Sequence, residues 1–183
     1  GDKVGKHTDI PVEPDKADYT DESGYFYADD YDEAYKEYEK EVEIFNGDTR
    51  PIAVMIDNVG DARPQAGLND AYIVYEMIVE GGLTRMMAVF KDDTTARIGT
   101  IRSSRHYYLD YAMENDAIYV HFGESPQAGS DLKKFRINDI DGIAEDGTTF
   151  WRVRDKYAPH NAVTSTEKLL KSAQNKKYKT TSS

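Results

Sequence analysis

Short apolar segments recur between residues 50 and 183, and stretches rich in polar residues, glycine and proline separate them. Segments that are almost wholly apolar are typical of strands buried on both faces, whereas alternating segments are typical of strands with one buried face. The predicted strands cover residues 52–56, 71–80, 84–90 and 117–122. A turn at Gly81 and Gly82 joins the second strand to the third and predicts an antiparallel pair.

Helical signals lie between these strands and after them. Residues 103–114 predict a helix whose N-cap is Ser103 or Ser104. Ser125, which a proline follows, predicts a second helix start, and a capping box at residues 164–167 predicts a third. Because strands and helices alternate and one strand pair is antiparallel, we expect an α/β fold with a mixed sheet and layered strands and helices.

The first 49 residues have a different character and are predicted to form an acidic arm ahead of a domain at 50–183. From residue 1 to about 24 apolar residues are scarce, which is typical of an extended spacer. Between residues 30 and 45 apolar side chains recur at helical spacing, which predicts an amphipathic helix that needs a partner surface, most simply the body of its own chain. This apolar stripe consists of Tyr31, Tyr35, Tyr38, Val42 and Phe45.

The net charge of −11 is unevenly distributed along the chain. Residues 1–49 contain 16 acidic and 5 basic residues, whereas residues 50–183 contain 18 of each. An acidic arm repels phosphate backbones, and a neutral body gains little from counterion release, so we expect no nucleic-acid partner. The same argument disfavours direct attraction of the chain to an anionic membrane surface.

Composition and spacing exclude several further classes. The chain has no cysteine, which excludes disulfide scaffolds, thiolate zinc sites and cysteine nucleophiles. No apolar run approaches the roughly 18 residues of a membrane span. The histidines lack the spacing of a metal site, and no phosphate-binding loop, dinucleotide fingerprint or EF-hand is present. We therefore expect neither a metal nor a cofactor.

Three arginines form the first candidate site. Arg85 begins a predicted strand, while Arg102 and Arg105 lie three residues apart, with Ser103 between them, at a predicted helix start. The planar fork of an arginine binds a carboxylate or phosphate at two points. These four residues therefore predict a cradle for an anion. The alternative is that the arginines pair with acidic residues inside the fold.

A serine forms the second candidate site. Residues 123–125, between a strand and a helix, resemble a nucleophile elbow that ends on Ser125. Pro126 comes next, however, and it lacks the N–H group that would stabilise an oxyanion. A helix cap is therefore the favoured role, although the hydroxyl and the free helix N–H groups could still hold an anion.

Histidines form the third candidate site. His121 ends an apolar strand, and His160 lies in a loop that contains a proline. If these histidines converged with Glu80 or Asp57, they would form a metal site or an acid–base site. The alternative is that each histidine is hydrogen-bonded and structural.

Nine short motifs follow one another between residue 50 and about residue 170. They are RPIAVMIDN at 50–58, ARPQ at 62–65, IVYE at 73–76, VEGGLTR at 79–85, IGTIRSSR at 98–105, DAIYVH at 116–121, DGI at 141–143, APHN at 158–161 and TSTE at 164–167. In this order they resemble the successive signatures of the YerB-like family of bacterial lipoproteins. The arm shares no motif with that family.

The resemblance implies an α/β fold and a location on the extracellular face of the bacterial cell membrane. The precursor of such a protein would carry a signal peptide and a lipid-modified cysteine, and this chain contains neither segment. The family also has a second, smaller C-terminal domain beyond the segment matched here. Because the family has no known function, the resemblance indicates compartment and fold more than activity.

Three functional hypotheses follow. The leading one is a non-catalytic binding or scaffolding module for an anionic or peptide-like ligand of the cell envelope: a small molecule, a peptide or glycan fragment, or another envelope protein. Its candidate binding residues are Arg85, Arg102, Ser103, Arg105, Ser125 and Asn161. The second is an envelope hydrolase with His121 or His160 as general base and Glu80 as partner. The third is a purely structural partner protein whose charges are all paired internally.

Overall fold

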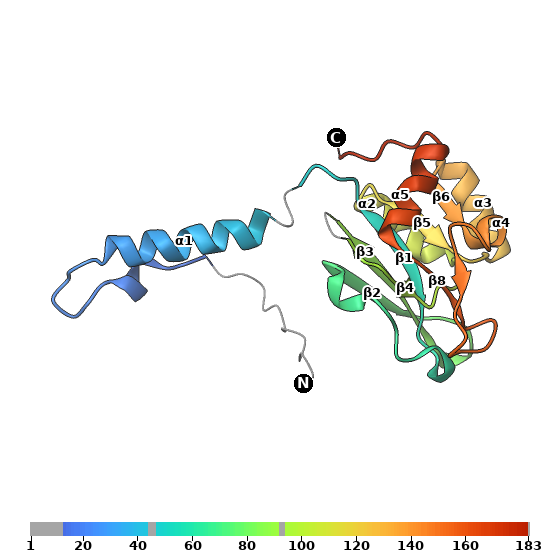
Figure 1. Ribbon diagram of the computed structural model, residues 1–183, viewed down its shortest axis with the longest axis horizontal. Helices are drawn as coiled ribbons and strands as arrows, with labels where there is room; N and C mark the ends of the chain where they lie inside the picture. The colour runs from blue at the N-terminus through green and yellow to red at the C-terminus, as the bar shows by residue number, and fades with distance from the viewer. Residues whose placement is uncertain (1–12, 44–46, 92–93, 183) are drawn as a thin grey trace. The chain divides into compact units, whose positions relative to one another are not determined.

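A computed structural model describes residues 13–43, 47–91 and 94–182 of the chain (Figure 1). The chain divides into two compact units, Gly1–Gly47 and Asp48–Ser183. The first unit corresponds to the acidic arm and the second contains both β-sheets.

The arm folds locally around aromatic side chains. It contains the 3₁₀ helix η1 (Lys16–Tyr19) and helix α1 (Ala28–Glu43), with a bridge between Thr20 and Phe26. The ring of Tyr31 lies 5.7 Å from that of Tyr19 and 5.5 Å from that of Phe26. Part of the predicted stripe therefore has its partners within the arm, and residues 16–27 are folded rather than extended.

The predicted helix begins two residues earlier than expected, at Ala28. The rings of Tyr31, Tyr35 and Tyr38 follow one another along it at centroid distances of 5.8 and 5.9 Å. The side chain of Val42 and the whole of Phe45 lie outside the described residues. The apolar stripe is thus observed over its first three members.

The main sheet of the second unit has five strands and is mixed. Their order is β2 (Ile73–Ile78), β3 (Thr84–Phe90), β1 (Ile52–Asp57), β5 (Ile118–His121) and β6 (Asp139–Asp141). The pairs β2–β3 and β3–β1 are antiparallel, whereas β1–β5 and β5–β6 are parallel. The prediction of an α/β fold with a mixed sheet is confirmed.

A second, smaller sheet is antiparallel and was not predicted. It consists of β4 (Ile98–Gly99), β8 (Ala162–Thr164) and β7 (Trp151–Arg152). Strands of two or three residues are too short to show a period in the sequence. Their position is therefore set by pairing with segments distant in the chain.

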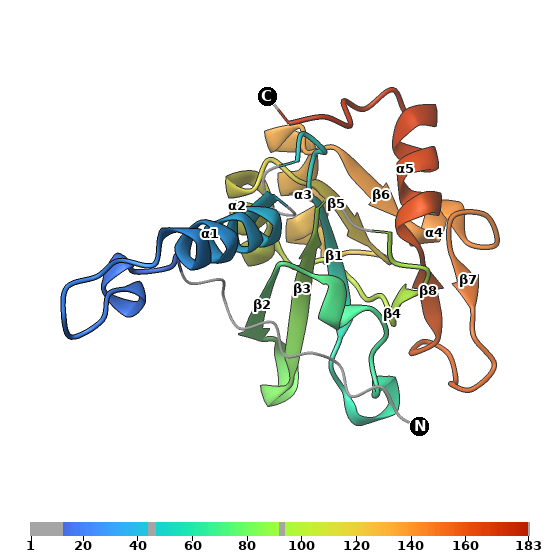
Figure 2. The same ribbon diagram turned by 60° about the vertical axis from the view of Figure 1, so that its left-hand side comes forward.

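Helices and the small sheet cover the two faces of the main sheet (Figure 2). The remaining elements are η2 (Gly60–Ala62), η3 (Leu68–Asp70), η4 (Glu80–Gly82), η5 (His106–Tyr108), α2 (Leu109–Glu114), α3 (Pro126–Phe135), α4 (Gly142–Glu145) and α5 (Thr166–Asn175). One core cluster includes Leu109 of α2 and Leu132 of α3, and the other includes Leu169 of α5 and Ile98 of β4. Strands β1 and β5 are thus buried on both faces, as their apolar sequences predicted, whereas the edge strand β2 is largely exposed.

Two of the predicted helix starts are confirmed, and one of these two lies one residue later than predicted. The hydroxyl of Ser125 accepts from the Ala128 N–H at 3.3 Å, and a proline follows Ser125 at the first helical position. Helix α5 is capped by Ser165, whose hydroxyl accepts from the Lys168 N–H at 3.3 Å, so this helix begins one residue later than the capping box indicated. Local hydrogen bonds define both starts, which explains why the sequence shows them.

Candidate functional site

The candidate site lies where strands β1 and β5 separate. The two strands pair in parallel over three residues each, and beyond that point residues 100–104 lie between them. The Arg102 N–H donates to the Met55 carbonyl at 3.1 Å, and the Arg102 carbonyl accepts from the Phe122 N–H at 3.1 Å. In α/β folds, ligands bind at the carboxyl ends of parallel strands, where the strands part. Residues 100–105 occupy that position.

This inserted segment shows that the helix start predicted at Ser103 or Ser104 is wrong. The Ser104 N–H donates to the Gly123 carbonyl at 2.8 Å, and the Ser104 carbonyl accepts from the Ser125 N–H at 3.2 Å. Because these bonds hold the backbone of Ser104 against β5, regular helix begins only with η5 at His106. The bonding partners are distant in sequence, so no local pattern revealed them.

Asp57, at the end of β1, is the centre of the site. Its side chain is 2% exposed, with Arg102 Nε at 3.3 Å and His160 Nδ1 at 2.7 Å from Oδ2. Arg85 lies directly opposite Asp57 in the antiparallel register of β3. Burying a carboxylate is costly unless it is paired, and these neighbours provide the partners of Asp57.

Arg85 is buried in the same cluster, with 7% of its surface exposed. Its Nη1 donates to the Ser103 carbonyl, while Nε and Nη2 have no acceptor within the described ranges. Burial lowers the pKa of Arg85, and the positive charges of Arg105 and Arg102 lower it further, against a smaller opposite effect of Asp57 and Glu80. Three guanidinium groups are therefore gathered in one place.

Arg105 is anchored at the rim of this cluster. Its Nε donates to Glu80 Oε1 at 2.7 Å and its Nη1 to the Ser104 carbonyl at 2.8 Å. The hydrogen bond from Arg105 and one from the backbone lower the pKa of Glu80 to about 2, so this carboxyl is ionised at neutral pH. The cluster therefore contains three arginines and two carboxylates, which leaves one positive charge in excess.

Four of the six predicted binding residues are thus brought together, and two have other partners. The hydroxyl of Ser125 caps α3, as the predicted alternative indicated. The Oδ1 atom of Asn161 accepts from Arg152 Nη1 at 3.0 Å, and Nδ2 donates to the Val153 carbonyl at 3.4 Å. Asn161 therefore supports the loop that carries His160.

The three candidate catalytic residues do not form one group in the described part of the chain. His121 is fully buried, Glu80 pairs with Arg105, and His160 pairs with Asp57. Of the two histidines, only His160 has a partly exposed side chain, at 22%, and its Nε2 has no hydrogen-bond partner among the described residues. Of the two acids named from the sequence, Asp57 and not Glu80 is the partner of His160.

His121 lies between two oxygen acceptors. Its Nδ1 is 2.9 Å from the Gly123 carbonyl and its Nε2 is 3.1 Å from Asp139 Oδ2. Burial alone would lower the pKa of His121, but the hydrogen bonds to Asp139 and Gly123 and the nearby negative charges raise it overall. Because the Gly123 carbonyl can only accept, Nδ1 carries a proton, and the contact of Nε2 with the Asp139 carboxylate favours the doubly protonated, positively charged form of His121.

The same histidine lies beside two further carboxylates. Ligand atoms of His121, Glu124 and Asp141 lie within 4.8 Å of one another, which is close enough for a metal site. However, His121 Nδ1 is directed at a carbonyl, and Asp141 Oδ1 already accepts from the N–H groups of Gly123 at 2.9 Å and Ile143 at 3.0 Å. These atoms are therefore already engaged in hydrogen bonds, and the group is a buried histidine surrounded by acids.

A polar network around Asn58, beside the site, was not predicted from the sequence. The amide of Asn58 donates to Glu76 Oε1 at 2.9 Å and to Thr84 Oγ1 at 2.8 Å. It also accepts from Arg63 Nε at 3.1 Å and from Gln65 Nε2 at 2.7 Å. The available signal was the Asp-Asn pair that ends an apolar strand, because a buried amide needs several partners.

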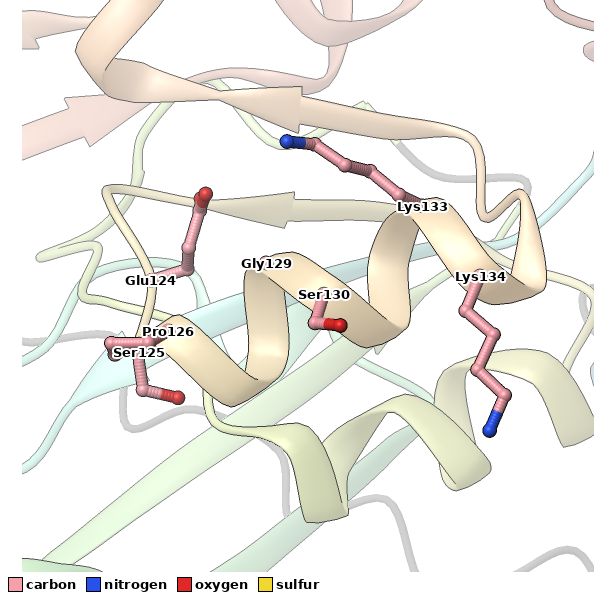
Figure 3. A pocket seen from close by; sticks show the side chains of 7 residues that line it. All are labelled: Glu124, Ser125, Pro126, Gly129, Ser130, Lys133 and Lys134. Atoms are coloured by element: carbon pink, nitrogen blue, oxygen red, sulfur yellow. The ribbon is translucent and has the colours of Figure 1, made fainter.

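A shallow hollow runs along α3, next to the site (Figure 3). It measures about 820 Å³ and is lined by Glu124, Ser125, Pro126, Gly129, Ser130, Lys133 and Lys134. Figure 3 shows Glu124 and Lys133 on one side of the helix and Lys134 on the other. Both charge signs line the hollow, so it shows no preference for either.

Comparison with known proteins identifies the family. A family model described as "Protein of unknown function (DUF3048) N-terminal domain" matches residues 39–179. The chain belongs to this family. The YerB-like resemblance predicted from the motifs is therefore confirmed, and the family is one of unknown function.

A relative of this DUF3048 chain, YerB of Bacillus subtilis, matches it both in sequence and in structure. The chain is 39% identical over 130 residues to "Putative lipoprotein YerB" of strain 168, and the match covers 71% of this chain and 39% of the relative. The crystal structure of YerB matches with a TM-score of 0.73 and 36% identity over 76% of this chain and 48% of that one. The chain therefore spans less than half the length of this relative.

The name of the relative describes it as a lipoprotein, which is a membrane-anchored protein of the cell envelope. In this DUF3048 chain, no helix among the described residues is both long enough and apolar enough to cross a membrane.

Proposed function

We propose that this domain is a non-catalytic binding module, lipid-anchored in its precursor on the outer face of a bacterial membrane. It recognises an anionic group, a carboxylate or a phosphate, of a cell-envelope ligand. Anchoring is supported by the similarity to a lipoprotein, and binding is supported by the arginine cluster at the carboxyl ends of β1 and β5. The ligand classes remain those predicted from the sequence: a small molecule, a peptide or glycan fragment, or another envelope protein.

The proposal rests on one observation: Arg85 is largely buried but donates to a single protein acceptor in the part of the chain that the structure describes. Its Nε and Nη2 have no acceptor among the described residues, and neither atom is fully enclosed by protein, so both are open to an acceptor from outside. Arg85 has one protein acceptor, the Ser103 carbonyl, and it lies near two other arginines. Bringing together like charges with spare donors is unfavourable in the free protein. A bound anion would provide both the missing charge and the missing acceptors.

We expect Arg105→Gln to weaken retention of the chain on purified cell-wall material about tenfold, because a charge-assisted hydrogen bond is lost. Arg85→Lys, which keeps the charge but loses the fork, should also weaken retention. Arg154→Gln is the matched control, because Arg154 is exposed and lies outside the cluster. Retention is measured by pull-down, with inorganic phosphate as competitor. Equal retention of Arg105→Gln and Arg154→Gln would refute the proposal.

One contact favours a hydrolase as the second candidate function. Asp57 is buried and orients His160 through Nδ1, which leaves Nε2 as the atom that could take a proton. An acid that orients a histidine base in this way is a common feature of hydrolases.

For this alternative, His160→Ala should abolish release of soluble fragments from cell-wall material. The Asp57–His160 pair would then act in catalysis. His106→Ala is the control, since His106 is exposed and lies in η5. No release by the unmodified chain would exclude the hydrolase while leaving the binding module untouched.

A further inference from the structure

Beyond the arginine cluster, the opposite edge of the main sheet carries a second group of basic residues. Strands β1, β5 and β6 are parallel, so their amino ends lie at the edge away from the candidate site. Helix α3 ends at Phe135, shortly before β6, and the C-terminal segment after α5 crosses the same edge. Figures 1 and 2 both show this segment running from the end of α5 toward the start of β1.

Hydrogen bonds fix the C-terminal segment at this edge. The Tyr178 hydroxyl donates to the Asp139 carbonyl at 3.0 Å, at the start of β6. The Arg50 N–H, just before β1, donates to the Thr180 carbonyl at 2.8 Å, and its side chain donates to the Lys179 carbonyl at 3.3 Å. The basic residues that flank these contacts are therefore held together by the fold, although they come from two distant parts of the chain.

We define the amino-edge patch as Lys134, Phe135, Arg136, Lys177 and Lys179. All five residues are exposed, and Phe135 is 44% exposed. None of the four cations forms an ion pair within the ranges that the structure describes. Lys134 Nζ lies 5.0 Å from the centre of the Phe135 ring, so a positive charge and an apolar ring are presented side by side.

Acidic residues at this edge are fewer, and two of them are already paired. Asp116 pairs with Arg50 at 3.1 Å, and Asp139 pairs with His121 at 3.1 Å. Asp48 and Glu114 remain as exposed acids before β1 and β5. Against the four unpaired cations of the amino-edge patch they leave a positive excess, although the body as a whole is neutral.

We propose that the amino-edge patch rests on an anionic lipid surface. Exposed lysines and arginines are attracted to anionic headgroups, and an exposed aromatic ring beside them inserts at the boundary between headgroups and acyl chains. The arm joins the second unit at Asp48, just before β1, so the chain is tethered at the edge that carries the patch. With this edge on the membrane, the arginine cluster at the other edge faces away from it and is open to envelope ligands.

This proposal differs from the expectation drawn from average charge alone. The acidic arm repels anionic lipid, and a neutral body shows no net attraction to it. Lipid, however, responds to the charges within about 10 Å of its surface at 0.1 M salt, and not to the mean over the whole chain. The fold concentrates four cations at one edge, which the order of residues in the sequence does not show.

The test tethers the whole chain to vesicles through an N-terminal histidine tag and a nickel-chelating lipid. Since the chain has no cysteine, a single environment-sensitive fluorophore can be placed by Asn175→Cys, at the end of α5. We expect its emission to rise about twofold when phosphatidylglycerol replaces phosphatidylcholine, and to fall back in about 1 M salt. A fluorophore at Arg154→Cys, between β7 and β8, should not respond.

Charge reversal then assigns the effect to the patch. Lys134→Glu combined with Lys179→Glu should abolish the rise in emission, whereas Arg97→Glu combined with Lys168→Glu, an equal change of charge elsewhere, should preserve it. Equal responses at residues 175 and 154, no response at either, or equal effects of the two charge reversals would each overturn the proposal. If soluble polyphosphate raised the emission of the fluorophore at residue 175 without vesicles, the amino-edge patch would bind anionic polymers, and the proposal of a lipid surface would be overturned as well. Because the arginine cluster is untouched, this result is independent of binding to cell-wall material.

Discussion

Asp57→Ala is expected to lower the free energy of unfolding by about 3 kcal/mol, because removing one partner of a buried ion pair leaves the other charges uncompensated. The carboxylate of Asp57 is 2% exposed and contacts both Arg102 and His160, with Arg85 opposite it in the sheet. Without it, the excess of positive charge in the cluster rises from one to two. Urea denaturation followed by circular dichroism measures the change.

Two further variants separate the charge from the shape of the side chain. Asp57→Asn keeps the hydrogen-bonding oxygen and should cost less than Asp57→Ala. Asp155→Ala removes an acid whose side chain is 63% exposed and pairs with Arg97, and such a surface pair contributes about 1 kcal/mol at most. If Asp57→Ala and Asp155→Ala were equally stable, Asp57 would not hold the cluster together.

His121 should make the protein lose stability as the pH rises above about 6.5, the ordinary pKa of histidine. The pKa of His121 is raised in the folded protein, so the folded state binds its proton more tightly than the unfolded state does. The resulting stabilisation is complete below about pH 6.5 and is lost as the pH rises through the raised value, with a slope of at most about 1.4 kcal/mol per pH unit. Urea denaturation at a series of pH values measures it.

His121→Gln should remove this slope, because glutamine does not titrate. Asp139→Asn should shift the loss of stability to lower pH, since the carboxylate of Asp139 is the main group that raises the pKa of His121. His106→Gln is the control and should keep the slope, because His106 is exposed. A slope that survived in His121→Gln would show that another group produces it.

The charged groups around Asp57 and His121 concern binding as well as stability. The arginine cluster and His121 lie at one edge of the main sheet, where β1 and β5 have their carboxyl ends and the antiparallel strand β3 begins. Asp57 and Glu80 neutralise part of the cluster, and the remaining charge together with the spare donors of Arg85 favours an anion. Variants of Asp57 therefore report on folding, whereas variants of Arg105 report on binding.

Much of the fold could be predicted from the sequence, because the signals involved are local. The strands predicted at 52–56 and 84–90 are short and mainly apolar segments, which is typical of buried strands. Strands β1 and β3 have almost these bounds. The turn at Gly81 and Gly82 has positive φ at both residues, a conformation that glycine adopts without strain. Ser125 caps its helix through a group three residues away.

The candidate site could be predicted only in part, because its geometry depends on long-range pairing. The sequence indicated that Arg85, Arg102 and Arg105 bind anions, from the chemistry of the guanidinium group alone. It placed two of them at a helix start, whereas the structure places them in a segment that separates two strands. It also gave the histidine base Glu80 as its partner, whereas the partner of His160 is Asp57.

The sequence by itself determined the class of fold, the separation of an acidic arm from a neutral domain, and the family. These follow from periodicity, local caps, the distribution of charge and the order of short motifs, all of which can be read along the chain without knowing which distant residues meet. Only the tertiary structure decided which charges meet: Arg85 faces Asp57 through sheet register, and Lys134 lies at the same edge as Lys179 because the C-terminal segment crosses that edge. Electrostatic energy depends on distance in space, and no count of charges along the chain contains that distance.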